Sequence, residues 1–310
     1  MTEEFYHTVG KEVDMLRNNI EKTILIILCI AVIGLCTFTG CNFDGKRGLS
    51  SSDPSANSSV HDKEAAAREA QLLKDKDAGL FVLVNKFNHV PESYEPEDLA
   101  QMTHCAEGRD PSTQFMRREA VESFNRMVEA AAAENIEIVM TTAYRSHGFQ
   151  NVLWTHNVLV KGSEAEANKT SARPDESEHR TGLAVDISTK SVNYEVTVNF
   201  ENTDAGKWVQ EHAHEYGFII RYPKEKADVT GYSYEAWHLR YVGITAAEDI
   251  YSKGITLEEY LQETGMATTL NGDAAVFVNE NKLMSDKAAD DSEVVDAPIN
   301  TTAVNSDESG

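Results

Sequence analysis

The sequence predicts an α+β domain in which a small antiparallel sheet is flanked by helices. Two kinds of pattern support this class: short apolar runs typical of strands, and apolar residues that recur at helical spacing. The two kinds do not alternate as they do in a parallel βαβ fold, so a mixed antiparallel arrangement is favoured. The 310-residue chain is 41% hydrophobic and 8% aromatic, which is enough apolar material for a sizeable core.

Five short apolar runs predict the strands. They are poor in charge and are bounded by loop or turn residues, and most are rich in β-branched or aromatic side chains. The runs are 80–85, 136–143, 183–187, 218–220 and 239–242.

The helices are predicted from apolar spacing and from end signals. Asp110 and Pro111 offer a cap and a first-turn proline before a helical pattern that extends to Ala131. A second helix is predicted over 148–160, and the polar, Ala-rich stretch 61–77 is predicted to form an exposed helix. The two remaining helices cover about 205–216, with Asp204 as cap and Gly217 as terminator, and a short segment that begins at Thr256.

The chain is strongly acidic, with 28 Lys and Arg against 51 Asp and Glu and a net charge of −23. This charge excludes a sequence-nonspecific nucleic-acid binder and a polybasic membrane-surface protein, because both need a basic footprint. Residues 267–310 contribute −7 and contain almost no aromatic side chains. That composition predicts a disordered acidic tail.

The N-terminal segment 1–41 is predicted to be a signal or an anchor. Residues 24–38 form a run of 15 residues without charge, a length between a signal-peptide core and a membrane-spanning helix. Small residues stand directly before Cys41, as in the lipobox of bacterial lipoproteins, so Cys41 is a lipidation candidate. A lipidated Cys41 and an uncleaved transmembrane anchor both remain open.

The rest of the chain divides into three parts. Residues 42–78 are predicted to be a flexible linker, because they include the Ser-rich stretch 49–60. Residues 79–266 are predicted to be a single domain, followed by the acidic tail 267–310.

The chemistry is concentrated in two segments. Ser177-Glu178-His179 leads through Gly182 into the strand that carries Asp186, and the second segment is Glu235-Ala236-Trp237-His238. If the chain turns near Gly182, His179 and Asp186 can reach the same point, and His238 could complete a metal site. On spacing alone, a hydrogen-bonded His–Asp pair in a core is the favoured interpretation.

The linked motifs resemble the zinc D-alanyl-D-alanine carboxypeptidases of the VanY type, peptidase family M15, subfamily B. The resemblance rests on Ser-x-His-x-x-Gly-x-Ala-x-Asp (177–186) and, about fifty residues later, Glu-x-Trp-His (235–238). The stretch 83–99, the element from Tyr144 to Gln150 and the segment 216–223 add to it.

The resemblance implies one zinc ion per chain, bound by His179, Asp186 and His238. It implies that Glu235 is the catalytic base and that Arg145 binds substrate and stabilises developing negative charge. Gln150 and Ser177 match positions that line the substrate groove.

The implied function is removal of the C-terminal D-alanine from peptidoglycan stem peptides, of the D-Ala-D-Ala carboxypeptidase type. An L,D-carboxypeptidase that acts on tetrapeptide stems and a peptidoglycan endopeptidase remain alternatives. A further alternative is a module that keeps the fold and binds the cell wall without catalysis. The expected location is extracytoplasmic, with the N-terminal segment in the cytoplasmic membrane and the domain facing the cell wall; the sequence does not reveal an oligomeric state.

Overall fold

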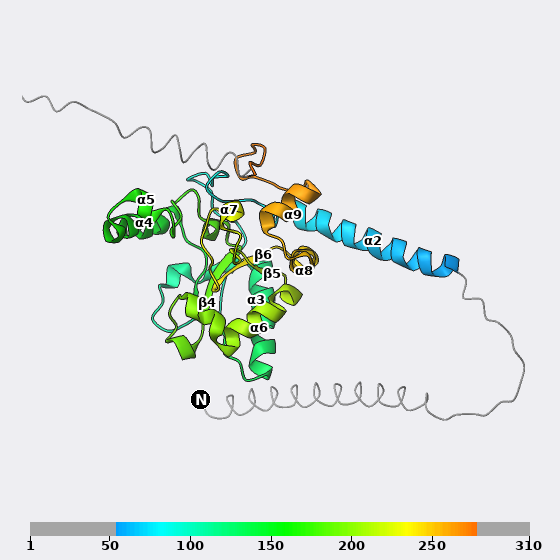
Figure 1. Cartoon of the computed structure of the whole chain (residues 1–310), viewed down its shortest axis with the longest axis horizontal. Helices are drawn as coiled ribbons and strands as arrows, with labels where there is room; N and C mark the ends of the chain where they lie inside the picture. Colours follow the sequence, from blue (N-terminus) through cyan, green and yellow to red (C-terminus); the bar gives the residue numbers. More distant parts are fainter. Residues whose placement is uncertain (1–53, 278–310) are drawn as a thin grey trace, which may run out of the picture. The chain divides into compact units, whose positions relative to one another are not determined.

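The computed structural model describes residues 54–277 (Figure 1). The predictions for the apolar run 24–38, for Cys41 and for the tail beyond residue 277 fall outside this range. Within residues 54–277, no helix is long and apolar enough to cross a membrane.

Helices and strands are mixed along the described chain. The strands are β1 (Leu99–Gln101), β2 (Phe115–Arg117), β3 (Val139–Thr142), β4 (Ala184–Ser188), β5 (Phe218–Ile220) and β6 (His238–Tyr241). The α-helices are α2 (Pro54–Asp77), α3 (Arg118–Ala133), α4 (His147–Lys161), α5 (Glu164–Ala167), α6 (Asp204–His212), α7 (Ala227–Thr230), α8 (Ile244–Lys253) and α9 (Leu257–Thr264). Short 3₁₀ helices are η1 (Pro111–Thr113), η2 (Glu178–Thr181), η3 (Lys190–Val192), η4 (Val198–Asn202) and η5 (Ala213–Tyr216).

The centre of the fold is a four-stranded antiparallel sheet in the order β3-β4-β6-β5. Strands β4 and β6 occupy the middle, and every residue of both is buried. Apolar side chains of the sheet pack with those of α3, α6, α8 and α9 in one core. Helices α4 and α5 lie together at one end of the domain, away from α6 and α8 (Figure 1). The prediction of an α+β fold with a small antiparallel sheet is confirmed.

The segment 80–85 is buried, as predicted, but it is not a regular strand. Val82 forms only an isolated bridge with Thr268. The backbone carbonyls of Leu80 and Val82 accept hydrogen bonds from the guanidinium of Arg240. A side chain therefore satisfies groups that a neighbouring strand would otherwise satisfy.

The helix predicted to begin after Asp110 begins later. Asp110 caps the short helix η1, and β2 follows before α3 starts at Arg118. The backbone carbonyls of Thr113 and Phe115 accept hydrogen bonds from the amides of Ala143 and Tyr144. This long-range pairing holds the segment extended, and local helical spacing could not reveal it.

Two boundaries also differ from the prediction. Helix α2 begins at Pro54, inside the stretch predicted to be a flexible tether, and proline suits the first turn of a helix. At the other end, residues 267–277 pack against the domain instead of starting a disordered tail. Leu270 and Phe277 contact the core, and the Thr268 carbonyl accepts a hydrogen bond from the Leu83 amide.

Candidate metal centre and active site

Two neighbouring strands place an acid and a histidine side by side. Asp186 lies in β4 and His238 is the first residue of β6, and the two are directly paired across the antiparallel ladder. Because cross-strand partners project from the same face of a sheet, both side chains meet at one point. Both are buried in spite of their polarity.

His179 reaches this point through a tight turn. It belongs to η2, which ends at Gly182 with φ of +67°. A Cβ at Gly182 would lie 2.9 Å from Cδ2 of Leu99, so both the backbone conformation and the space favour glycine. The turn that the sequence required near Gly182 is confirmed.

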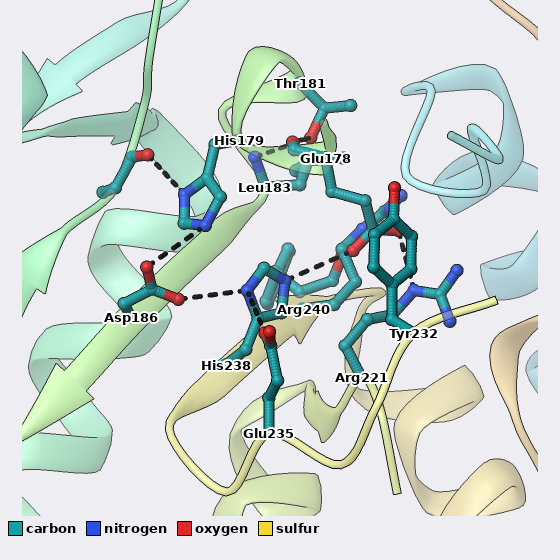
Figure 2. Close-up of polar contacts among 12 residues, drawn as sticks. Glu178, His179, Thr181, Leu183, Asp186, Arg221, Tyr232, Glu235, His238 and Arg240 are labelled. Atoms are coloured by element: carbon teal, nitrogen blue, oxygen red, sulfur yellow. Dashed lines mark hydrogen bonds and ion pairs between the residues drawn. The ribbon is translucent and has the colours of Figure 1, made fainter. Parts of the chain in front are cut away.

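The three side chains form a compact ligand set (Figure 2). Nε2 of His179 lies 3.4 Å from Oδ2 of Asp186, and Nδ1 of His238 lies 3.0 Å from Oδ1 of the same carboxylate. Ligand atoms of a tetrahedral zinc site lie about 3.3 Å apart, given bond lengths of about 2.0–2.1 Å. The two imidazole nitrogens and the carboxylate offer three ligand atoms within 4.8 Å of one another, a set that fits zinc and leaves a fourth position open.

The backbone orients one of the histidine ligands. Nδ1 of His179 lies 2.6 Å from the carbonyl oxygen of Ala143, so this nitrogen carries the proton and donates it. The lone pair of the neutral ring is then on Nε2, which faces Asp186. His179 is thus held ready to bind a cation through Nε2.

The charges around His238 also favour a bound cation. Burial alone would lower the pKa of His238, yet its hydrogen bond with Asp186 and the nearby carboxylate of Glu178 raise that pKa to about 9. Burial lowers the pKa of His179 to about 4, and the positive charge of Arg145 adds to this effect. Carboxylates therefore surround His238, and a divalent cation would balance their negative charge.

Glu235 lies beside the ligand set, in the loop that precedes β6. Its Oε2 is 3.7 Å from Nδ1 of His238, and its side chain is 17% exposed. Burial raises the pKa of the Glu235 carboxyl to about 7. The carboxylate faces the ligand set but also contacts solvent, which is the position a proton carrier needs.

Arg145 brings the cationic group that the sequence predicts. Its Nη2 donates to Oδ2 of Asp186 at 2.5 Å, and its Nη1 donates to Oε1 of Gln150 at 3.3 Å. Gln150 is itself fixed, because its Nε2 donates to the Ala172 carbonyl at 2.9 Å. The guanidinium therefore has a defined orientation at the edge of the ligand set.

The predicted metal ligands, catalytic residues and substrate-binding residues all line one cavity of about 520 Å³. Its wall includes Arg145, Gln150, Ser177, His179, Asp186, Glu235 and His238. Phe149 and Leu153 of α4 and the rings of Tyr222 and Tyr232 extend the wall beyond the ligands. The groove thus combines a polar reacting end with room for a peptide.

Two buried charged residues next to His179 were not given a role from the sequence. Arg180 has no exposed surface and donates to the carbonyls of Pro91, Glu92 and Tyr94. Glu178 is also buried and faces His238. In the sequence, charged residues on both sides of a histidine are typical of an exposed segment. Only their contacts in the structure show that Glu178 and Arg180 belong to the interior.

Comparison with known proteins identifies the family. The family model of VanY, a D-alanyl-D-alanine carboxypeptidase, matches residues 113–244. A D-alanyl-D-alanine carboxypeptidase of Enterococcus faecalis is 32% identical over 207 residues, which is 64% of this chain and 72% of that protein. The chain belongs to the VanY family of D-alanyl-D-alanine carboxypeptidases.

Solved structures of related enzymes agree with this membership. The LdcB LD-carboxypeptidase, whose structure is solved, is 44% identical in sequence and matches this chain with a TM-score of 0.56. The match covers 59% of this chain and 86% of the LdcB chain. The vancomycin-resistance D,D-pentapeptidase VanY, solved as a mutant in complex with Zn(II), is 34% identical with a TM-score of 0.50. This match covers 58% of this chain and 98% of the VanY chain. Solved enzymes of both L,D and D,D bond specificity therefore share this fold.

Proposed function

We propose that this VanY-family protein is a zinc carboxypeptidase that releases the C-terminal D-alanine from peptidoglycan stem peptides. The observation that carries the proposal is the convergence of His179, Asp186 and His238 with Glu235 and Arg145 in one cavity. The three ligands alone could serve a structural metal. A carboxylate and a guanidinium beside an open fourth position are what hydrolysis requires.

His179, Asp186 and His238 hold the zinc ion. When bound, zinc supplies Lewis-acid polarisation of the scissile carbonyl and activation of water. Glu235 takes a proton from the attacking water as the water oxygen bonds to the carbonyl carbon. Glu235 then gives a proton to the nitrogen of the departing D-alanine as the C–N bond breaks.

Arg145 stabilises the negative charge that develops on the carbonyl oxygen. Its side chain is only 15% exposed, and a largely buried guanidinium is more effective for this than the same group in water. Gln150 and Thr142 fix its orientation through hydrogen bonds, so little reorganisation is needed during the reaction. Gln150 and Ser177, both buried in the wall, help to define the substrate groove.

Two bond specificities are candidates. The family description favours cleavage between the two D-alanines of a pentapeptide. The 44% identity with LdcB, against 34% with the D,D-pentapeptidase VanY, supports L,D cleavage of a tetrapeptide. On this balance, we favour the L,D-carboxypeptidase activity.

Defined peptides test the proposal. The full chain is incubated with a tetrapeptide stem, with a pentapeptide stem and with a cross-linked dimer, and D-alanine release is measured. Faster release of D-alanine from the tetrapeptide would support L,D specificity. Faster release from the pentapeptide would contradict L,D specificity and support D,D specificity. Cleavage of the dimer alone would indicate an endopeptidase. Retained peptide binding without any release would indicate a wall-binding module and would overturn the proposed function.

The location is also part of the proposal. The uncharged run 24–38 followed by Cys41 supports an extracytoplasmic domain anchored to the cytoplasmic membrane and facing the wall. Metabolic labelling with a palmitate analogue tests the lipidated form: label should be lost in Cys41→Ser and kept in Cys36→Ser. An unlabelled wild-type chain that still fractionates with membranes would favour the transmembrane anchor.

A further inference from the structure

Glu178 is a fully buried carboxylate that the reaction described above does not use. Its side chain has 0% exposure. One of its oxygens, Oε1, accepts hydrogen bonds from Nε of Arg221 at 2.7 Å and from Nη1 of Arg240 at 2.6 Å. The two arginines therefore balance the negative charge of Glu178 at Oε1 alone.

The other oxygen of Glu178 faces a metal ligand. Oε2 lies 3.5 Å from Nε2 of His238 (Figure 2). Both atoms are buried, and neither has a hydrogen-bond partner in the part of the chain that the structure describes. Two unsatisfied polar atoms that point toward each other in a core indicate a contact that is completed in the functional state.

Glu178 cannot easily turn away from His238. Arg221 is held by Glu258 of α9 through contacts of 2.8 and 2.5 Å. Arg240 is held by the carbonyls of Leu80 and Val82. The arginines are thus anchored independently of the metal site, and they fix the direction in which Oε2 of Glu178 points.

We propose that Glu178 is a positioning residue that accepts a hydrogen bond from Nε2–H of His238 and so presents Nδ1 of that ring to zinc. A neutral imidazole has one N–H, so a proton kept on Nε2 leaves the lone pair on Nδ1. Nδ1 is the nitrogen that faces Asp186, at 3.0 Å. The inference rests on the zinc site of the proposed function.

The two histidine ligands then use opposite ring nitrogens. His179 donates from Nδ1 to a backbone carbonyl and ligates through Nε2, whereas His238 donates from Nε2 to a carboxylate and ligates through Nδ1. A carboxylate also makes the ring a stronger donor to the metal than a carbonyl does. Glu178 therefore sets both the orientation and the basicity of His238.

A matched pair of variants tests the role of Glu178. In Glu178→Gln, one amide has to face both the arginine donors and the His238 N–H, and its NH₂ group opposes a donor in either orientation. Zinc affinity, measured by competition with a chelator, should fall about 10- to 100-fold. Glu176→Gln makes the same change at a buried carboxylate two residues earlier, outside the cavity wall, and should leave zinc affinity unchanged.

A second measurement needs no variant, so it stands even if Glu178→Gln does not fold. The full chain, labelled with ¹⁵N-histidine, is loaded with ¹¹³Cd, and metal–nitrogen coupling is recorded by NMR. The proposal expects coupling to Nε2 of His179 and to Nδ1 of His238, with a slowly exchanging proton on Nε2 of His238.

The outcomes separate this inference from the proposed function. Coupling of cadmium to Nε2 of His238 overturns the role of Glu178, as does a folded Glu178→Gln that binds zinc as tightly as the wild type. In either case D-alanine release by the zinc-loaded wild type would leave the proposed function intact. A wild-type chain that binds no zinc would overturn the proposed function itself.

Discussion

Glu235 and His179 share one cavity, but their tasks can be separated. In the proposed mechanism Glu235 carries protons, and it is not needed to hold the metal, because the ligand set consists of His179, Asp186 and His238. We expect Glu235→Ala to retain zinc while D-alanine release falls by about 10²- to 10⁴-fold, the usual contribution of general acid–base catalysis. Metal content by mass spectrometry and D-alanine release on the same sample check both parts.

Two histidine variants serve as controls for that experiment. His179→Ala should lose the zinc itself, since it removes a ligand. His147→Ala should retain zinc, because His147 is a partly exposed residue whose ring lies 3.8 Å from Glu92. A Glu235→Ala protein that keeps most of its rate would show that Glu235 is not the base.

Glu176 gives a pH-dependent prediction for stability. Burial raises the pKa of its carboxyl above the usual value, and its Oε2 has no hydrogen-bond partner among residues 54–277. The unfolded chain therefore ionises first, and this residue lowers the free energy of unfolding as pH rises from the unfolded pKa through the folded one. The charged groups around it are Asp175, Arg173, His89 and Lys86.

We expect Glu176→Gln to melt at a higher temperature than the wild type at pH 7. The difference should shrink as the pH falls below about 4, where the carboxyl is protonated in both states. Thermal melts between pH 3 and pH 8 measure it. A variant that is less stable than the wild type at pH 7 would contradict the prediction.

The resemblance of the linked motifs to a family predicted the ligands, but the sequence did not predict the residues that support them. His179, Asp186 and His238 occur in motifs whose order along the chain matches a family. Glu178, Arg221 and Glu258 are charged residues that composition places on a surface. Their burial depends on mutual pairing across segments distant in sequence, which no local pattern records.

At the scale of the element, the turn from η2 into β4 brings His179 to the sheet. Gly182 ends η2 with φ of +67°, and a Cβ there would meet Leu99 at 2.9 Å and Arg117 at 3.2 Å. Gly182→Ala should therefore cost about 1–3 kcal/mol of stability, the usual cost of a strained backbone position. Zinc affinity should fall as well, because the turn positions a ligand.

Gly148→Ala is the matched control for the turn. Gly148 lies in α4 without positive φ, and a Cβ there meets nothing within 4 Å. This variant should be neutral or more stable by up to about 1 kcal/mol. Denaturant unfolding of both variants measures the contrast, and equal stabilities would show that the turn is not strained by a side chain.

Elements were predictable where their own residues determine them. β4 and β6 have apolar residues at alternate positions, and α9 has a capping box of Thr256 and Glu259. The segment 80–85 is a short apolar run that also predicts a strand, yet Arg240 donates to the carbonyls of Leu80 and Val82. Its conformation thus depends on a guanidinium 160 residues away, which strand propensity cannot predict.

At the scale of the whole molecule, the net charge of −23 is accompanied by a cluster of acidic side chains at the site. The body of the chain is acidic, and its cavity concentrates Asp186, Glu178 and Glu235 around two histidines. Without a cation these carboxylates raise the pKa of His238 to about 9. A bound metal ion would therefore displace the proton from His238 and place a positive charge among these carboxylates.

Removing the metal should consequently affect stability as well as activity. Because the ligands come from η2, β4 and β6, zinc binds the folded chain far better than the unfolded one. At a free zinc concentration a thousand times the dissociation constant, the folded state gains about 4 kcal/mol, or roughly 10 °C in melting temperature for a domain of this size.

A strong chelator should abolish D-alanine release and lower the melting temperature by that amount, and added zinc should restore both. His179→Ala should show no further drop with the chelator. Turnover and melting temperature that are unchanged by the chelator would rule out the zinc mechanism.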